Sequence, residues 1–158
     1  MDLAAELRYL RDIEEIRQLK YRYCAYCDNS YDPDGIASCY ARNGAFGSDP
    51  SEPHVRGRDA IRAVFREQSK IFPFAVHSVS NPIINVDGDR ATGKWKLFQP
   101  CTINRPDGPE AAWISGEYSD IYVREDGQWL FEWVGIKMLF VTPYADGWVK
   151  TPMAFPEM

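Results

Sequence analysis

The segment Ile84-Asn85-Val86-Asp87-Gly88-Asp89-Arg90-Ala91 determines the fold class, because it joins two runs of strand-forming residues through a tight turn. An Asp-Gly pair between such runs is a strong hairpin signal, since both residues tolerate the positive φ that a two-residue turn requires. The signal recurs at Pro106-Asp107-Gly108 and at Asp126-Gly127. These turns delimit four predicted strands, at about residues 74–86, 89–102, 110–124 and 127–141. Sequential hairpins predict an antiparallel meander.

The N-terminal part of the chain has helical periodicity instead. Apolar residues recur there at three- and four-residue steps and form one stripe: Ile16, Leu19, Tyr23, Tyr26 and Cys27. Such a stripe must face a core. The earlier Leu3, Leu7 and Leu10 lie on a different stripe. This drift indicates either a bend in the helix or a separate contact, for example with another subunit.

Two further helices are predicted before the sheet. One starts at Asp32-Pro33, where an N-cap acid precedes a proline at the first helical position, and ends at Gly44. The other follows Gly57. Three N-terminal helices and one meander predict a single α+β domain over residues 1–158. A strongly curved antiparallel sheet around a long helix forms a cone that encloses a small-molecule pocket.

Charge and hydropathy exclude several classes of partner. The net charge of −5 and the lack of a clustered basic face argue against nucleic acid, whose phosphates need such a face. No apolar run approaches the 18 or so residues of a membrane span. The acidic N-terminus lacks the pattern of a secretory signal, so a cytoplasmic location is expected.

The cysteines and histidines do not suggest a metal or redox centre. Cys24 and Cys27 form a C-x-x-C, but it lies inside a helical pattern rather than after a strand. The chain has only two histidines and no second C-x-x-C, so a zinc site is poorly supported. Nucleotide-binding loops, nucleophile elbows and H-E-x-x-H motifs are also missing from the sequence. We therefore expect reduced core thiols and no metal or cofactor.

Asp28 and His77 are the main candidates for chemistry. A carboxylate beside an imidazole transfers protons near neutral pH, because the acid fixes the ring tautomer and stabilises the imidazolium. Both residues also have ordinary roles: a strand histidine can cap a backbone group, and an aspartate can cap a turn. His77 shares a strand face with Asn81, so both would point into the cone.

Several aromatic residues can also serve the pocket. Tyr23 and Tyr40 are core aromatics by type, but their hydroxyls suit a hydrogen bond to a carbonyl or leaving oxygen. Trp113 and Tyr118 are two of the many aromatic residues in the predicted strands of the sheet. Those that face the mouth of the cone would favour a flat apolar ligand.

Short segments along most of the chain match one known family in order and spacing. They are Glu15-Ile16-Arg17-Gln18-Leu19, Tyr23-Cys24-Ala25-Tyr26-Cys27-Asp28, Gly57-Arg58-Asp59-Ala60-Ile61, His77-Ser78-Val79-Ser80-Asn81-Pro82, Val86-Asp87-Gly88-Asp89-Arg90-Ala91 and Tyr122-Val123-Arg124-Glu125-Asp126-Gly127-Gln128-Trp129. On these segments the chain resembles the SnoaL-like branch of the nuclear transport factor two-like superfamily. The resemblance implies a cystatin-like α+β cone.

The resemblance also implies a chemistry. Similar family enzymes are scytalone dehydratase, gamma-hexachlorocyclohexane dehydrochlorinase and bile acid 7-alpha-dehydratase, which use an aspartate–histidine pair, without metal or cofactor, to remove a proton and expel water or chloride. Asp28 and His77 match that pair, and Tyr23 matches a family tyrosine or lysine. The family arginine on the last strand falls at Met138. The adjacent Lys137 can replace it only if a bulge turns it inward, because a one-residue shift reverses the face.

Together these features predict a cofactor-independent lyase of dehydratase or dehydrohalogenase type, or an isomerase, acting on a small hydrophobic cyclic molecule. His77 would be the base, Asp28 its partner, and Tyr23 or Tyr40 the donor to the oxygen. The predicted substrate contacts are Tyr40, Asn81, Trp113, Tyr118 and Lys137. The alternative is a non-catalytic cone that binds a small molecule or acts as a subunit. A homo-oligomer, trimer or dimer, is expected from relatives and from the aromatic sheet face.

Overall fold

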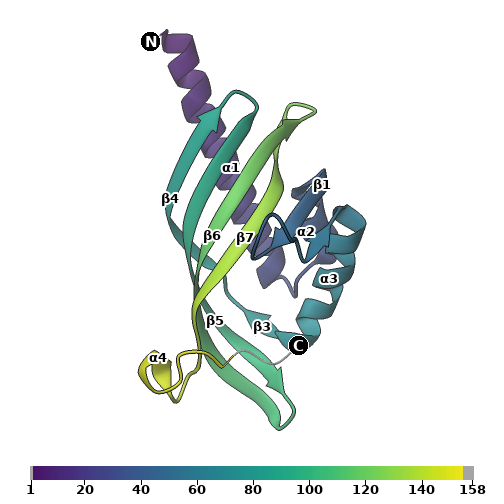
Figure 1. The fold of residues 1–158 in the computed structure, drawn as a ribbon, viewed down its shortest axis with the longest axis vertical. Helices are drawn as coiled ribbons and strands as arrows, with labels where there is room; N and C mark the ends of the chain where they lie inside the picture. The colour runs from purple at the N-terminus through teal and green to yellow at the C-terminus, as the bar shows by residue number, and fades with distance from the viewer. Residues whose placement is uncertain (1, 155–158) are drawn as a thin grey trace.

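The computed structural model describes residues 2–154, in which a curled sheet wraps around a long helix (Figure 1). The helices are α1 (Leu3–Asp28), α2 (Pro33–Ser38), α3 (Arg58–Ile71) and α4 (Gly147–Lys150). The strands are β1 (Tyr40–Gly47), β2 (Val55–Arg56), β3 (Phe74–Ala75), β4 (Ser78–Asp87), β5 (Arg90–Arg105), β6 (Gly108–Glu125) and β7 (Gln128–Pro143). The α+β cone predicted from the sequence is confirmed.

The sheet has the strand order β2-β1-β7-β6-β5-β3, with β4 also paired to β5. Strands β4 to β7 form the predicted antiparallel meander. Its tight turns adopt the left-handed backbone that their sequences indicate, with φ of 58° at Gly88, 51° at Asp126 and 78° at Gly127. Strand β1 is the exception to the antiparallel pattern, because it pairs in parallel with β7.

Helix α1 packs along the concave side of the sheet and contacts β4 and β7. It begins at the N-cap Asp2, whose carboxylate accepts a hydrogen bond from the Ala4 backbone N–H at 3.3 Å. The helix is continuous, and its first turns extend past the sheet with Leu3, Leu7 and Leu10 exposed (Figure 1). Among residues 2–154, no helix has both the length and the apolar character needed to cross a membrane.

The prediction of a second helix reaching Gly44 is wrong, and so is the prediction that all three helices precede the sheet. Helix α2 ends at Ser38, and Tyr40 begins strand β1, which comes before α3. The physical reason is the close packing of β1 on β7. A side chain at Gly44 would place its Cβ 2.7 Å from the Phe131 carbonyl oxygen. Gly44 therefore allows two strands to approach and does not mark a helix end.

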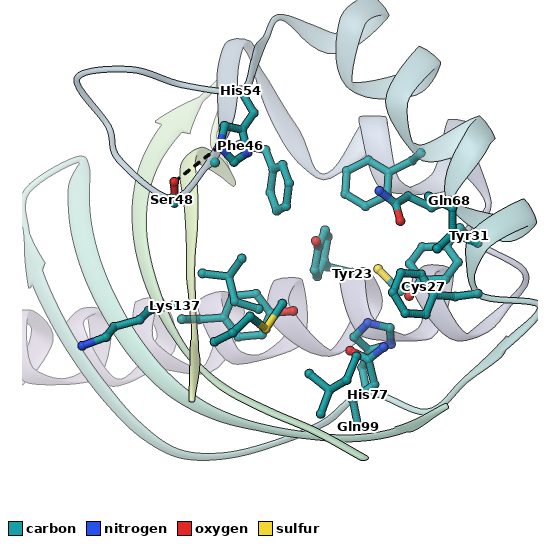
Figure 2. Close-up of a pocket in the computed structure, with 18 residues that line it drawn as sticks. Tyr23, Cys27, Tyr31, Phe46, Ser48, His54, Gln68, His77, Gln99 and Lys137 are labelled. Carbon is teal, nitrogen blue, oxygen red and sulfur yellow. Dashed lines mark hydrogen bonds between the residues drawn. The ribbon is translucent and has the colours of Figure 1, made fainter. Parts of the chain in front are cut away.

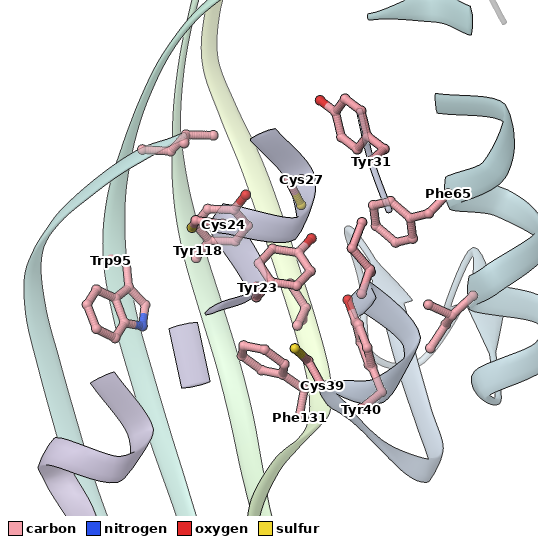
Figure 3. Close-up of a cluster of buried hydrophobic side chains, with 14 of the residues drawn as sticks. Tyr23, Cys24, Cys27, Tyr31, Cys39, Tyr40, Phe65, Trp95, Tyr118 and Phe131 are labelled. Carbon is pink, nitrogen blue, oxygen red and sulfur yellow. The ribbon is translucent and has the colours of Figure 1, made fainter. Parts of the chain in front are cut away.

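The core lies between α1 and the inner face of the sheet and is rich in aromatic rings (Figure 3). The Tyr23 ring meets those of Tyr40, Phe65 and Phe131 edge-on, at centroid distances of 6.2, 6.3 and 5.4 Å. Such edge-to-face pairs are favourable because the positive edge of one ring meets the negative face of the other. Cys24, Cys27, Cys39 and Cys101 are free and buried, and their predicted place in the core is confirmed.

Candidate active site

The structure brings Asp28 and His77 together at the end of α1. Asp28 is the last residue of the helix, and His77 lies between β3 and β4. The Asp28 Oδ1 atom accepts a hydrogen bond from the His77 backbone N–H at 2.8 Å and lies 2.7 Å from Nδ1 of the ring. An ionised carboxylate only accepts hydrogen bonds, so Nδ1 carries the proton and Nε2 is left as the basic nitrogen.

The two side chains differ in their exposure. The His77 side chain is 5% exposed and lines the internal cavity, whereas the Asp28 side chain is 32% exposed and stands behind the ring. The imidazole therefore faces the cavity, and the carboxylate, which does not line the cavity, is partly exposed to solvent. This arrangement gives a buried base a charged partner without burying the charge completely.

A sharp turn after α1 supports the pair. Ser30 and Tyr31 both have left-handed backbones, with φ of 55° and 53°. The Tyr31 backbone N–H donates to the Cys27 carbonyl at 3.0 Å and holds the turn against the helix end. The turn places the Tyr31 ring edge-on to the His77 ring, with centroids 5.7 Å apart and planes at 84°. Non-glycine residues in this region cost energy, which the surrounding contacts must offset.

His77 opens onto a cavity of about 530 Å³ inside the cone (Figure 2). Its walls are mainly apolar and come from α1, α3 and the inner faces of β1, β5, β6 and β7. The lining residues include Phe46, Phe65, Ile71, Phe72, Ile114, Ile136 and Met138. A volume of this size and an apolar wall are typical of small-molecule sites. Among residues 2–154, no group of three or more His, Cys, Asp or Glu side chains is placed to hold a metal ion.

Tyr23 and Tyr118 line this cavity. Burial raises the pKa of both hydroxyls well above the usual value, so each remains protonated and able to donate a hydrogen bond. Tyr118 also has a cation behind it, because the Lys20 Nζ atom lies 3.3 Å from the centroid of its ring. Both tyrosines can therefore serve as neutral donors to an oxygen inside the cavity.

Two of the predicted substrate contacts, Tyr40 and Asn81, do not line the cavity, which corrects the sequence-based prediction. Tyr40 is fully buried in the core behind Tyr23. Asn81 is exposed, with a φ of 53°, at an irregularity between Ser80 and Ile83. The bulge breaks the alternation that would have kept Asn81 on the face of His77.

Trp113 also lies outside the cavity, on the outer face of the sheet. Its ring stacks on Phe98 at 5.3 Å and contacts Tyr144 at 5.7 Å. The neighbouring Ile114 lines the cavity, and adjacent strand residues point to opposite faces. The prediction that Trp113 contacts the substrate is therefore wrong.

Lys137 borders the cavity through its place in β7, but its side chain points away from it (Figure 2). The flanking Ile136 and Met138 occupy the inner face instead. The register of β7 shifts opposite Ile121/Tyr122 and opposite Ser115/Gly116, and neither shift falls at Lys137. A register shift that would turn the lysine inward does not fall at this position, so the charged end of Lys137 lies outside the cavity that its backbone borders.

Sequence reasoning missed several polar residues that line the cavity: Tyr31, Ser48, His54, Gln68 and Gln99. Gln99 could have been found, because it alternates with the buried Leu97 and Cys101 on β5. His54 lies in the connection between β1 and β2, where no periodic pattern indicates direction. Only the tertiary structure reveals that it faces the cavity.

Comparisons with known proteins identify the family and agree with the fold. Residues 8–133 match the family model of the SnoaL-like domain. A Mycobacterium tuberculosis protein of unknown function is 29% identical, with 87% of this chain and 76% of that chain covered and a TM-score of 0.70. A putative scytalone dehydratase from Novosphingobium aromaticivorans is 20% identical, with 94% and 96% covered and a TM-score of 0.73.

A hexachlorocyclohexane dehydrochlorinase is similar over nearly its whole length. It is 19% identical, with 97% of this chain and 99% of that chain covered and a TM-score of 0.79. At this identity the likeness concerns the fold. No curated protein matches the chain.

Proposed function

The chain belongs to the SnoaL-like domain family, and from this premise we propose that it is a lyase, or an isomerase, acting on a small hydrophobic cyclic substrate. The observation that carries the proposal is the 2.7 Å contact between Asp28 Oδ1 and Nδ1 of His77, whose ring lines an apolar cavity. The similar structures include proteins named as a dehydratase and a dehydrochlorinase, and both names denote eliminations.

In the proposed reaction His77 is the general base. Its Nε2 atom takes a proton from a C–H bond next to a carbonyl, and the electrons of that bond form the new double bond. Asp28 stabilises the imidazolium through the hydrogen bond at Nδ1. The bond to the leaving oxygen breaks, and the proton returns from His77 so that water departs. In an isomerase the same proton would return to another carbon.

The developing negative charge on oxygen needs a donor. Tyr23 and Tyr118 line the cavity with protonated hydroxyls, because burial raises the pKa of each. A hydrogen bond from either hydroxyl would stabilise the charge where water has little access. No step in this scheme requires a metal or an organic cofactor.

The substrate class follows from the cavity wall. The lining is mainly apolar, and Lys137 directs its charge away from the space. A neutral, largely apolar ring compound is therefore favoured over one with a carboxylate or phosphate group.

Turnover of cyclic β-hydroxyketones tests the proposal, because elimination of water gives a conjugated enone that absorbs in the ultraviolet. A correctly placed general base contributes about 10²–10⁴-fold. His77→Ala should lower turnover by about that factor, with the melting temperature and the circular dichroism spectrum nearly unchanged. Equal turnover by the wild type and His77→Ala would remove the histidine from the mechanism.

The second candidate function is a non-catalytic cone that binds a small molecule. The observation that favours this function is that most residues lining the cavity beside the Asp28–His77 pair are apolar. Ligand binding that raises the melting temperature, with no turnover of any β-hydroxyketone or β,γ-unsaturated ketone by the wild type, would select this function.

We also propose that the protein forms a homo-oligomer, a trimer or dimer. The outer face of the sheet and the adjoining C-terminal segment carry large apolar side chains, and these are substantially exposed: Phe98 44%, Leu139 45%, Tyr144 66% and Trp148 57%. Apolar patches of this kind commonly mark protein interfaces. A mass of a single chain by light scattering would contradict the proposal.

A further inference from the structure

A second histidine faces the cavity from the side opposite His77. His54 lies in the connection between β1 and β2 and lines the cavity together with Ser48 (Figure 2). The His54 Nε2 atom is 3.4 Å from the Ser48 hydroxyl oxygen. The cavity therefore has a hydrogen-bonding pair at its far side, separate from the Asp28–His77 pair.

Close backbone packing fixes the position of His54. A side chain at Gly47 would place its Cβ 2.9 Å from the His54 backbone nitrogen and 3.1 Å from Cη2 of Trp133. Only glycine lets the end of β1 lie this close to the returning chain. The loop is also braced within itself, because the Asp49 carboxylate accepts hydrogen bonds from the backbone N–H and the hydroxyl of Ser51, at 2.8 and 2.7 Å.

The contact between His54 and Ser48 is a weak one. A distance of 3.4 Å exceeds the 2.7–3.2 Å of a well-formed hydrogen bond. A neutral imidazole and a hydroxyl each have both a donor and an acceptor, so either can exchange this contact for a ligand oxygen. Phe46 lies directly beside His54 in Figure 2 and supplies an apolar surface against which a ring can rest.

We propose that His54 and Ser48 form a specificity site that hydrogen-bonds an uncharged oxygen at the end of the ligand remote from His77. The ligand class is then narrower than a hydrophobic ring compound. It is a rigid apolar molecule with a hydroxyl or carbonyl oxygen at each end, one near His77 and one near His54. The site belongs to the same cavity and so rests on the proposed function.

Two biphenyl probes test the specificity site without requiring turnover. The probe 4,4′-dihydroxybiphenyl has an oxygen at each end, and 4-hydroxybiphenyl has only one. Titration calorimetry on the wild type should give an affinity about two- to tenfold higher for the diol, which is the range that one net hydrogen bond supplies. His54→Phe should bring the ratio of the two affinities close to one, whatever the substitution does to the binding of the apolar rings.

Ser48→Ala provides a second variant at an exposed loop position and should reduce the same preference. Equal affinities of the wild type for the two probes, or a preference that survives both substitutions, would overturn the specificity site. The proposed function fails by a different result. The wild type could prefer the diol, and lose this preference in His54→Phe, without turning over any substrate. That result would support the specificity site and indicate a binding protein rather than an enzyme.

Discussion

Helix α1 contributes one residue to each of two acid–base pairs, and the surroundings of the two pairs differ. Two turns before the end of the helix, the Lys20 Nζ atom lies 2.9 Å from Asp120 Oδ2, and both side chains are fully buried. The Tyr122 hydroxyl donates to the same Oδ2 atom at 2.9 Å, and the Trp95 Nε1–H donates to that hydroxyl at 3.0 Å. At the end of the helix, Asp28 binds a histidine that opens onto the cavity.

The difference shows which feature of an acid–base pair permits chemistry. Lys20 and Asp120 are enclosed by protein on every side, so a substrate cannot reach either group. His77 has one nitrogen engaged by Asp28 and the other left for the cavity. A pair that is closed off supports the fold, whereas a pair with one accessible nitrogen can exchange protons with a ligand.

The largest effect is expected from breaking the buried pair. Lys20→Met would leave the Asp120 carboxylate in the core without its cation, and such changes cost about 3–5 kcal/mol. Urea unfolding followed by circular dichroism would measure this loss. Burial raises the pKa of Asp120, so the folded state holds the proton more readily than the unfolded state. The destabilisation should therefore be greatest at neutral pH and shrink as the pH falls.

The matched control removes both charges. Lys20→Met combined with Asp120→Asn leaves a neutral amide that can still accept the hydrogen bond from Tyr122. Most of the lost stability should return, because the cost arises from the unpaired charge. A loss below about 1 kcal/mol in Lys20→Met alone would show that the core tolerates the single charge.

The sequence contains signals for both pairs, but of unequal strength. Asp28 and His77 stand out because Asp28 comes at the end of the predicted first helix, and His77 is the one histidine within a predicted strand. Both also lie in segments on which the chain resembles the family. Lys20 lies on the apolar stripe of α1, and Asp120 alternates with buried tyrosines on β6, so each could have been recognised as facing inward. Their pairing depends on the curvature of the sheet, which no local pattern specifies.

The fold was predictable where signals were local. The Asp-Gly turns defined the meander because the turn type depends on the residues within it. Strand β1 was missed because its partner β7 lies far along the chain. A glycine such as Gly44 can end a helix or permit close strand packing, and the sequence alone does not distinguish the two roles. Asn81 was misplaced for a related reason, since a bulge interrupts strand alternation without an obvious sequence mark.

The next effect tests the charge of the cavity pair. Asp28→Asn keeps the size of the side chain and an oxygen for the His77 backbone N–H, but removes the negative charge. A hydrogen bond to a charged group contributes about 1.5–3 kcal/mol, which corresponds to roughly ten- to hundredfold in turnover. The enone assay would measure this loss.

Asp34→Asn is a suitable control for Asp28→Asn, because Asp34 is an exposed acid bound to Arg62 on the surface. It makes the same chemical change away from the cavity and should leave turnover unaffected. If both variants retained full turnover, the imidazolium would not need a charged partner. The proposed catalytic role of the Asp28–His77 pair would then be contradicted.

A smaller effect on turnover should distinguish Tyr23 from Tyr40, to which the sequence analysis gave the same role. Tyr23 lines the cavity and Tyr40 lies behind it in the core. Tyr23→Phe removes one neutral donor and should lower turnover about two- to tenfold, the range of a single hydrogen bond. Tyr40→Phe should leave turnover unchanged. A loss confined to Tyr40→Phe would contradict the placement of the donor.

The smallest effect concerns the outer face of β7, where Lys137 lies beside residues that do line the cavity. Lys137 is paired with Glu117 of β6, whose pKa is lowered chiefly by Lys96 and less by Lys137. We expect Lys137→Ala to leave turnover unchanged and to shift the melting temperature by less than about 2 °C, as is usual for surface substitutions. Met138→Ala, one position along, should instead weaken binding of 4-hydroxybiphenyl, because Met138 forms part of the cavity wall. If the lysine variant weakened binding and the methionine variant did not, β7 would present its opposite face to the ligand, and the cavity would contain a cation where a neutral wall is inferred.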